Sequence, residues 1–437
     1  MRRSIPLSPE QHQTLEDRAN QVHPGLLDAI QSTSQRLGCP VFVVGGAPRD
    51  LVSSNPMGDL DLVVEGDGES FAPALANALG GKVKRHPRFF TAEVELPGGR
   101  LDVATTRQEY YDSPAVLPSV KPGPFEDDLR RRDFTVNTLA IELGKGPPFA
   151  IEDSYEALRD LKEHRLRVLH DESFIDDPTR ILRGVRLESR LGLRLDEVTE
   201  RLATGAVKDG VFDSLSSDRL RRELFRLLEP IGSIETRLQR LDELGVLSVL
   251  SRDLQLSAED QAWIGRAAEK AEGLPVDIAD VEGWRLAFPA LLGGLDRTAV
   301  ESVAARLALR PSEREWLLTS RLDLDHAVEV LRHPDSRPSD VDRALGPLRS
   351  EQIALLLAVT ESPVVRQAHA WLDDWRAVQL SLTGQELLEA GIAPGAWIGR
   401  ALDSTREARL NGTITAREEL DFALNLLKKE NSGTEIE

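Results

Sequence analysis

The stretch Val44–Gly68, which reads VGGAPRDLVSSNPMGDLDLVVEGDG, decides the fold of the N-terminal part of the chain. It places a glycine pair after an apolar run and then two aspartates separated by one leucine. Residues i and i+2 of a strand share a face, so Asp59 and Asp61 are predicted to project together while Leu60 and Leu62 face a packed side. Charge in a core-facing strand is costly unless it is paired, so the pattern indicates a bound cation.

The paired aspartates predict a metal site. Two carboxylates on one face suit Mg²⁺, which takes oxygen ligands and keeps water for substrate phosphates. Asp102, in GRLDVATTR, is a third candidate ligand from a strand that could lie beside the first. Three carboxylates on adjacent strands are typical of two-metal phosphoryl or nucleotidyl transfer. The simpler interpretation, preferred for such a pair in isolation, is that Asp59 caps a turn and Asp61 is a solvated edge position. The neighbouring motifs favour the metal.

The glycine pair indicates a phosphate site. Gly45 and Gly46 follow VFVV and allow a phosphate to approach the backbone closely. Pro48 suits the first position of a following helix, and a strand, a glycine turn and a helix N-terminus together form an anion site. The spacing matches neither the dinucleotide-binding fingerprint nor the P-loop. For the glycines alone, a tight turn is an equally good explanation.

Composition narrows the class of protein. A chain of 437 residues, 41% of them hydrophobic and 29% charged, is expected to form two to four packed units. The single cysteine, Cys39, excludes a disulfide framework, and we interpret it as a small buried hydrophobe of a cytoplasmic protein. We find no signal peptide and no apolar run long enough to span a bilayer, so no membrane partner is expected.

The charge is unevenly distributed. A formal net charge of −19 argues against nonspecific binding of nucleic acid over the whole surface. Arginines are nevertheless concentrated in RRRD at 130–133 and in one run that, at 100° per residue, forms a single helical stripe. The run comprises Arg180, Arg183, Arg186, Arg190 and Arg194. The stripe could face a triphosphate and RNA, or it could be a solvated face paired with local acids.

The periodicity of apolar residues along the chain predicts a small α/β head followed by a long helical remainder. Residues 8–38 are helical in pattern, with a break at HPG, 23–25. From Cys39 to about Leu143, short β-rich runs alternate with helical pieces, and from Tyr155 onward almost everything has helical periodicity. Near the C-terminus, Pro394 and Gly395 mark a helix start, whose free N–H groups could hold a backbone phosphate. Turn chemistry explains these two residues equally well.

Three motifs occur in an order that resembles the tRNA nucleotidyltransferases. After GGAPRD…DLD come DDLRRRDFTVNTLAIEL at 127–143 and DDPTRILRGVRLESRLGL at 176–193. A fourth, DRLRREL, begins at Asp218, where bracing between helices is the stronger interpretation. The chain resembles the bacterial-type class of that family, which includes CCA-adding, A-adding and CC-adding enzymes and poly(A) polymerases. The resemblance is close from about Val41 to Leu228 and loose thereafter.

The resemblance implies an α/β nucleotidyltransferase head, a polymerase-β-like mixed sheet with helices, followed by an all-α neck, body and tail. The expected parts are an N-terminal helical extension (1–38), the head (39–150), a neck with the nucleotide-base pocket (151–245), the body (246–375) and the tail (376–437).

The resemblance also implies roles for individual residues. The glycine turn and aspartate pair, which hold the triphosphate and the metals, fall on Gly45, Gly46, Arg49, Asp50, Asp59 and Asp61. The sugar and base contacts fall on Arg131, Arg132, Asp133 and Asn137. The residues that read the incoming base fall on Asp176, Asp177 and Arg180, with Arg183 one turn further on.

Base reading has an independent physical rationale. Residues three apart on a helix share a face, so Asp177 and Arg180 are predicted to meet one planar ligand edge. A carboxylate only accepts and a guanidinium only donates, which matches the amino group and ring nitrogen of cytosine and adenine and mismatches uracil and guanine. An ordinary surface salt bridge is the alternative.

The expected activity is addition of A, or of CCA, to the tRNA 3′ end without a template, with Mg²⁺, ATP and possibly CTP. The tail is expected to grip the tRNA elbow. A full-length segment between Asp102 and the Arg-Arg-Asp motif favours an enzyme that adds the terminal A. The alternatives are a CC-adding enzyme, a poly(A) polymerase acting on general RNA, and an inactive RNA-binding relative. No expectation about oligomeric state follows.

The sequence departs from the family pattern at three places. Pro48 stands where Val is usual and Thr138 where Ala is usual. The linker DSYEALRDL, 153–161, lacks two glycines that are common there, which weakens any expectation of a hinge.

Overall fold

The computed structural model describes residues 3–110, 115, 118–275, 280–359 and 362–432. Contacts divide the chain into two compact units, the first comprising residues 1–227 and 243–249 and the second residues 228–242 and 250–437. The predicted head and most of the predicted neck fall in the first unit, and nearly all of the predicted body and the predicted tail fall in the second. None of the helices in the described ranges is long and apolar enough to cross a bilayer.

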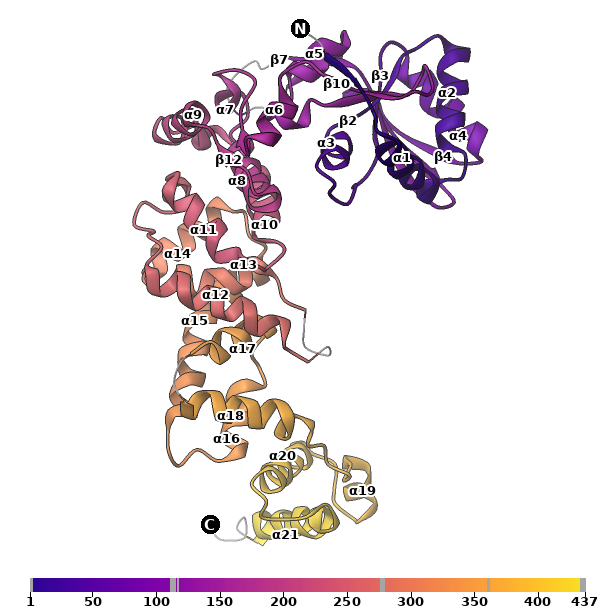
Figure 1. Ribbon diagram of the computed structural model, residues 1–437. Helices are drawn as coiled ribbons and strands as arrows, with labels where there is room; N and C mark the ends of the chain where they lie inside the picture. The colour runs from indigo at the N-terminus through magenta and orange to yellow at the C-terminus, as the bar shows by residue number, and fades with distance from the viewer. Residues whose placement is uncertain (1–2, 111–114, 116–117, 276–279, 360–361, 433–437) are drawn as a thin grey trace. The chain divides into compact units, whose positions relative to one another are not determined.

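A mixed eight-stranded sheet forms the centre of the head (Figure 1), in the order β1-β10-β9-β2-β3-β6-β5-β4. Strands β3 and β6 run parallel, and the other neighbours are antiparallel. The strands are β1 (Arg3–Pro6), β2 (Val41–Val44), β3 (Asp61–Val64), β4 (Lys82–His86), β5 (Thr91–Leu96), β6 (Gly99–Thr105), β9 (Ala140–Glu142) and β10 (Ala150–Asp153). The expected small α/β head is confirmed.

Helices cover both faces of this sheet. One face packs against α1 (Pro9–Val22), α2 (Leu26–Leu37) and α4 (Gly68–Leu79), and the other against α5 (Phe125–Arg130). The run VFVV is apolar at every position because Val41 and Val43 join the first core while Phe42 and Val44 join the second. Phe42 stacks on Phe125 with ring centroids 3.9 Å apart.

The N-terminal segment forms the two helices that its pattern predicts. Ser8 caps α1 in a capping box with Gln11, and the chain breaks at 23–25 before α2 begins. Both helices bury apolar side chains in the core of the head, and β1 pairs with β10. The helices of the expected N-terminal extension therefore contribute to the apolar core of the head.

The rest of the first unit carries the neck motifs. Beyond the sheet lie a hairpin, β7 (Arg107–Tyr110) with β8 (Ser119–Pro122), and a parallel pair, β11 (Arg165–Leu166) with β12 (Arg194–Leu195). The remaining helices are α3 (Gly46–Val52), η1 (Pro87–Phe89), η2 (Thr135–Asn137), α6 (Ala157–Lys162), α7 (Ser173–Asp176), α8 (Thr179–Leu191), α9 (Glu197–Lys208), η3 (Val211–Ser214), α10 (Ser217–Leu228) and η4 (Val246–Val249).

All the secondary-structure elements in the described residues of the second unit are helices, joined by loops. Its last helices have an apolar cluster of their own that includes Leu387, Ala401 and Ala423. The helices are α11 (Ile234–Glu243), α12 (Ala258–Glu272), α13 (Gly283–Leu291), α14 (Arg297–Arg306), α15 (Pro311–Arg332), α16 (Pro338–Leu345), α17 (Ser350–Leu357), α18 (Ser362–Asp373), η5 (Trp375–Ala377), α19 (Gly384–Glu389), α20 (Ala396–Leu410), η6 (Ala416–Glu418) and α21 (Glu419–Ser432). Gly395 precedes α20, so the helix start expected there is confirmed.

Candidate active site

The glycine turn joins β2 to α3 at the edge of a cavity. Gly45 has φ +78° and ψ −124°, a conformation that only glycine adopts without strain. A Cβ placed on Gly45 would lie 3.5 Å from Arg132 Nη1 and 3.6 Å from Asp61 Oδ2, so the turn passes close to both side chains. Helix α3 begins at Gly46, which makes Pro48 its third residue and corrects the prediction that Pro48 is the first.

The two aspartates flank the start of β3. Leu60 and Leu62 are buried, whereas Asp59 and Asp61 stay exposed, as the predicted alternation requires. The strand begins at Asp61, however, so Asp59 precedes it and is not a strand residue as predicted. Strand β3 lies between β2 and β6, which excludes the edge-strand interpretation of Asp61.

Asp102 lies where the metal hypothesis needs it, beside Asp61. The two residues are direct partners in the parallel pairing of β3 with β6. Asp61 is open to solvent on the cavity side, but the surrounding protein limits its hydration. This loss of hydration first, and then the charges of Asp102 and Asp59, raise the pKa of Asp61 to about 6, and the charge of Arg132 opposes this. Three mutually repelling carboxylates form a donor set that a hard cation stabilises, so these side chains fit a divalent metal.

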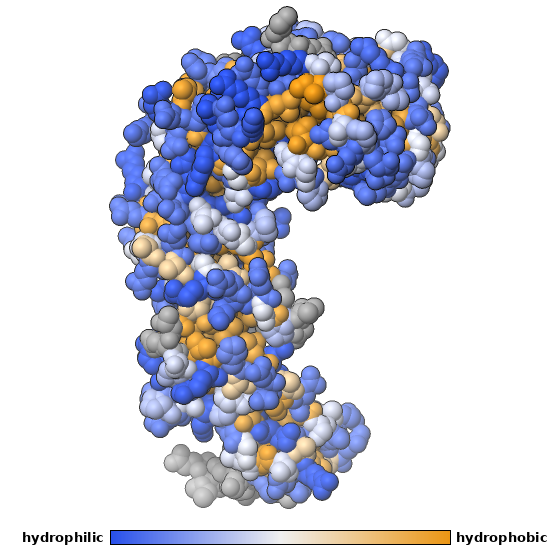
Figure 2. All heavy atoms as spheres, viewed as in Figure 1, coloured by the Kyte–Doolittle hydropathy of each residue, from blue (hydrophilic) through white to orange (hydrophobic). Residues whose placement is uncertain are grey.

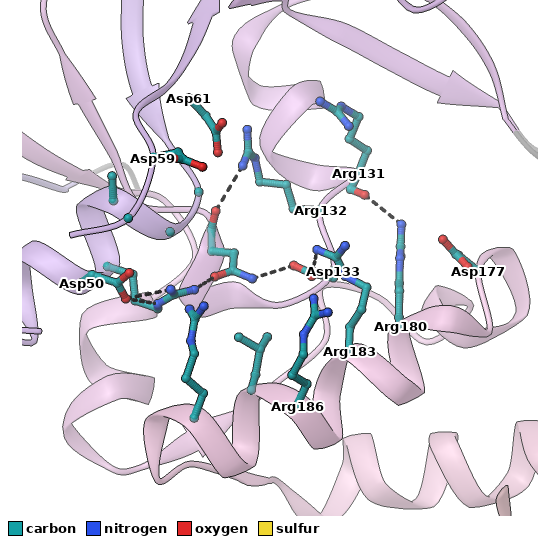
Figure 3. A pocket seen from close by; sticks show the side chains of 18 of the residues that line it. Asp50, Asp59, Asp61, Arg131, Arg132, Asp133, Asp177, Arg180, Arg183 and Arg186 are labelled. Carbon is teal, nitrogen blue, oxygen red and sulfur yellow. Dashed lines mark hydrogen bonds and ion pairs between the residues drawn. The ribbon is translucent and has the colours of Figure 1, made fainter. Parts of the chain in front are cut away.

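Other observations qualify the predicted metal site. Within the described ranges, no group of three or more His, Cys, Asp or Glu side chains is already arranged to hold a metal ion. Asp59 lies 3.6 Å from Arg18 Nη2 and its side chain is 76% exposed, so it is free to turn. Figure 3 shows Asp59 and Asp61 beside each other at one end of the cavity.

A buried carboxylate outside the predicted set holds both arginines of the Arg-Arg-Asp motif. Asp128 Oδ1 accepts from Arg131 Nε at 3.0 Å and Nη2 at 2.7 Å, and its Oδ2 accepts from Arg132 Nη2 at 3.0 Å. Burial opposes ionisation of Asp128, but the charges of Arg132 and Arg131 prevail and lower its pKa. Glu109 of β7 accepts from Arg131 Nη1 at 2.8 Å. The sequence contained a signal for these contacts, because Arg131 and Arg132 lie three and four residues after Asp128, at the spacing of helical ion pairs.

The third residue of the motif belongs to a second network. Asp133 accepts from Asn137 Nδ2 at 2.9 Å and from Arg183 Nη2 at 2.6 Å. Burial alone would raise the pKa of Asp133, but the Arg183 charge and these hydrogen bonds lower it to about 2. Asn137 also accepts from Arg49 Nη1, and Arg49 Nη2 lies 2.7 Å from Asp50 Oδ1. Residues of α3, η2, α8 and the loop before η2 are thus held in one chain of contacts (Figure 3).

Asp177 and Arg180 both line the cavity, but only Arg180 lies on a helix. Asp177 follows α7 in an extended conformation and accepts from Arg219 Nη2 at 2.8 Å. Arg180, inside α8, is buried and donates to Ser173 Oγ at 2.7 Å and to the Arg131 carbonyl at 2.8 Å. The prediction that the pair shares one helix face is wrong because Pro178 separates the two helices. Arg219 contacts Asp177 across elements, in keeping with its interpretation as a bracing residue.

Helix α8 carries most of the predicted arginine stripe. Arg180, Arg183, Arg186 and Arg190 all line the cavity. Arg194 does not, because α8 ends at Leu191 and Arg194 lies exposed in β12. The five arginines therefore do not form one helical stripe.

These residues enclose a polar cavity of about 520 Å³, within the range of small-molecule sites. Arg190 lines the cavity and makes no hydrogen bond or ion pair with any described residue. The Nε of Arg132 is buried and has no hydrogen-bond partner among the described residues, although the other nitrogens of Arg132 are bound. Asp102 is outside the lining. Of the predicted residues, the cavity is lined by Gly45, Gly46, Arg49, Asp50, Asp59, Asp61, Arg131, Arg132, Asp133, Asn137, Asp177, Arg180 and Arg183.

Two other sequence features have structural roles. Cys39 is buried, as interpreted, and burial raises the pKa of its thiol. In the linker, Asp153 caps α6 by accepting from the N–H groups of Ala157 and Leu158 at 2.9 and 3.1 Å. Glu156 has φ +63°, a left-handed conformation that favours glycine, at a position where the family motif has one.

Comparison with known proteins identifies similar molecules. The family described as the Poly A polymerase head domain matches residues 41–167. An A-adding tRNA nucleotidyltransferase of Geobacter sulfurreducens is 35% identical over 92% of this chain and 47% of its own length. An A-adding tRNA nucleotidyltransferase of Halalkalibacterium halodurans is 31% identical over 92% of both chains. The chain thus spans about half the length of the first relative and nearly all of the second.

A solved structure shows the same fold along the whole chain. The complex of a CCA-adding enzyme with ATP superimposes with a TM-score of 0.80 and 27% identity, covering 100% of this chain and 98% of the other. The likeness thus extends from the head, where the sequence motifs lie, to the helical remainder.

Proposed function

Because the chain belongs to the tRNA nucleotidyltransferase family, we propose that it adds adenosine to the 3′ end of tRNA without a nucleic-acid template. ATP is the nucleotide donor and pyrophosphate the product. The observation that carries the proposal is the cavity in which the aspartate pair, the glycine turn and the arginines of α8 come together. Two A-adding relatives that align with 92% of the chain support the choice of nucleotide.

The triphosphate has a set of partners in this cavity. The Gly45–Gly46 turn presents backbone at its edge, and Arg190 supplies a cation without a protein partner among the described residues. The buried Nε of Arg132 supplies an unused donor. Arg49 is occupied by Asp50 and Asn137, so we assign it to positioning these two side chains rather than to the phosphates.

The carboxylates supply the metal site. Members of this family generally use a divalent metal, and we propose that Asp59 and Asp61, with Asp102 beside them, hold Mg²⁺. A bound divalent cation supplies Lewis-acid activation of the hydroxyl and neutralises charge on the phosphates. In the overall reaction, the tRNA 3′ oxygen forms a bond to the α-phosphorus. The bond from that phosphorus to the bridging oxygen breaks, pyrophosphate leaves, and the hydroxyl proton passes to solvent.

Base selection falls to the residues at the other end of the cavity. Asp177 and Arg180 both line it, although each is bound to other residues. Recognition of adenine by this pair requires Arg180 to release the Arg131 carbonyl and Asp177 to loosen from Arg219. Asp133 and Asn137 form the intervening wall, where they face the sugar.

A single addition assay tests the proposal. Purified protein is incubated with Mg²⁺, with one labelled nucleotide at a time, and with tRNA that either ends in CC or lacks all of CCA. Addition of one A to the CC-ended tRNA, and no labelling of the shorter tRNA by CTP, is the expected result. Absence of any Mg²⁺-dependent pyrophosphate release would instead indicate an inactive RNA-binding relative.

A second candidate is addition of the complete CCA, favoured by the 27% identity and full-length superposition with a CCA-adding enzyme. CTP incorporation into tRNA lacking CCA, followed by A, identifies that activity. Incorporation that stops after CC identifies a CC-adding enzyme, and long A tails on RNAs other than tRNA identify a poly(A) polymerase. A tRNA substrate implies that the protein works in the cytoplasm.

A further inference from the structure

A second hollow adjoins the nucleotide cavity in the first unit. It has a volume of about 340 Å³, the size for one nucleotide rather than a duplex. Glu109, Arg131 and Arg180 line both hollows, so the two share a wall. A ligand bound in the second hollow therefore contacts residues that also line the nucleotide cavity, at the end where Arg180 lies.

The second hollow contains an arginine that is not paired with any residue in the described ranges. Arg130 is exposed and, among the described residues, makes no hydrogen bond or ion pair, whereas its neighbours Arg131 and Arg132 are held by Asp128. Such an arginine is available for a phosphate, and a guanidinium binds phosphate oxygens with high geometric specificity.

The hollow also presents an aromatic ring. Tyr110 is 44% exposed, which is unusual for so large a side chain. The Lys121 ammonium lies 4.5 Å from its ring centroid, and its hydroxyl donates to Gln108, so the ring is held in place. Bases of single-stranded RNA stack on rings presented in this way.

His170 completes the hollow with a polar group. Its Nε2 lies 3.8 Å from Asp176 Oδ2. Burial first, and then the charge of Arg180, lowers the pKa of His170, which favours the neutral ring at pH 7. A neutral imidazole both donates and accepts, as the edges of bases do.

We propose that the second hollow binds one nucleotide of the unpaired 3′ strand of tRNA, upstream of the reacting end. Tyr110 stacks on the base and Arg130 pairs with its phosphate. The inference rests on the proposed function, because the strand must arrive beside the nucleotide cavity for its 3′ hydroxyl to react.

Kinetics with tRNA ending in CC tests the inference. Tyr110→Ser is expected to raise KM for tRNA about tenfold, within the range measured for one base–aromatic stack. Arg130→Gln is expected to raise it about tenfold as well, because it removes a hydrogen bond to a charged phosphate. KM for ATP and kcat are expected to stay within about twofold, because neither side chain lines the nucleotide cavity. Tyr110→Phe keeps the ring and is expected to restore KM, and Arg194→Gln, an exposed arginine outside both hollows, serves as the matched control.

Binding measured without ATP separates this inference from the proposed function. Fluorescence anisotropy of the same labelled tRNA is expected to show a matching rise in Kd for Arg130→Gln and Tyr110→Ser. Unchanged Kd and KM in both variants, or a rise equal to that of Arg194→Gln, would overturn the inference, as would a rise in KM for ATP alone. A wild-type protein that binds this tRNA through Arg130 and Tyr110 but transfers no nucleotide would refute the proposed function and leave the hollow assigned.

Discussion

Replacing Asp128 by Asn is predicted to destabilise the first unit by about 3 kcal/mol. The Asp128 side chain is fully buried and is the common partner of Arg131 and Arg132. Asn removes the charge and turns an amide N–H donor toward guanidinium donors. Removing one partner of a buried ion pair costs about 3–5 kcal/mol, and the lower end applies because the two arginine side chains keep 19% and 15% exposure.

Urea unfolding followed by two probes measures this change. All six tryptophans lie between residues 263 and 397, in the second unit, so their fluorescence follows that unit, whereas far-UV circular dichroism follows both. Asp128→Asn is expected to lower the urea midpoint of the transition of the first unit, which is seen by circular dichroism but not by fluorescence. Asp127→Asn, next to it on α5, loses a carboxylate whose side-chain partner within the described part of the chain is Gln108. This variant is expected to cost less than about 1 kcal/mol.

The same variant is predicted to weaken nucleotide binding, because both arginines line the cavity. KM for ATP is expected to rise at least about tenfold, which corresponds to about 1.4 kcal/mol. If Asp128→Asn matched Asp127→Asn in both unfolding and KM, the view that Asp128 fixes the two arginines would be refuted.

Four further predictions concern single positions. Asp61→Asn should abolish nucleotide addition while leaving tRNA retention in a gel-shift assay nearly unchanged, and persisting activity would contradict the metal assignment. Gly45→Ala should cost about 1–2 kcal/mol in urea unfolding because φ is +78°, whereas Gly58→Ala, which meets open space, should not. Glu156→Gly should be neutral or stabilising by up to about 1 kcal/mol, since relief at φ +63° exceeds the added chain entropy, and Glu156→Ala should show no gain. The pKa of Asp133 is about 2 in the folded protein and 3.8 ordinarily, so ionised Asp133 stabilises the fold fully above about pH 4 and loses this effect as the pH falls toward 2. The difference in free energy of unfolding between the wild type and Asp133→Asn should therefore shrink in that interval. A difference that stays constant would contradict this.

Local pattern was sufficient to predict the head and much of the candidate site. Alternation placed Leu60 and Leu62 in the core and left Asp59 and Asp61 exposed, since side-chain direction in an extended chain has period two. The break at 23–25 separated two helices because glycine and proline act on the backbone locally. Family motifs then identified residues that line one cavity.

Partners and distances depended on how segments far apart in the chain pack together. Asp177 binds Arg219, 42 residues away, and Arg180 binds the Arg131 carbonyl, 49 residues away, so helical spacing did not predict the partner of either residue. The adjacency of Asp61 and Asp102 follows from the parallel pairing of β3 and β6, which is a long-range choice. Periodicity in the sequence predicts the face of a helix or strand on which a side chain lies. The hydrogen-bond partner of that side chain depends on which donors and acceptors the folded chain brings within reach, because buried polar groups must find partners inside the protein.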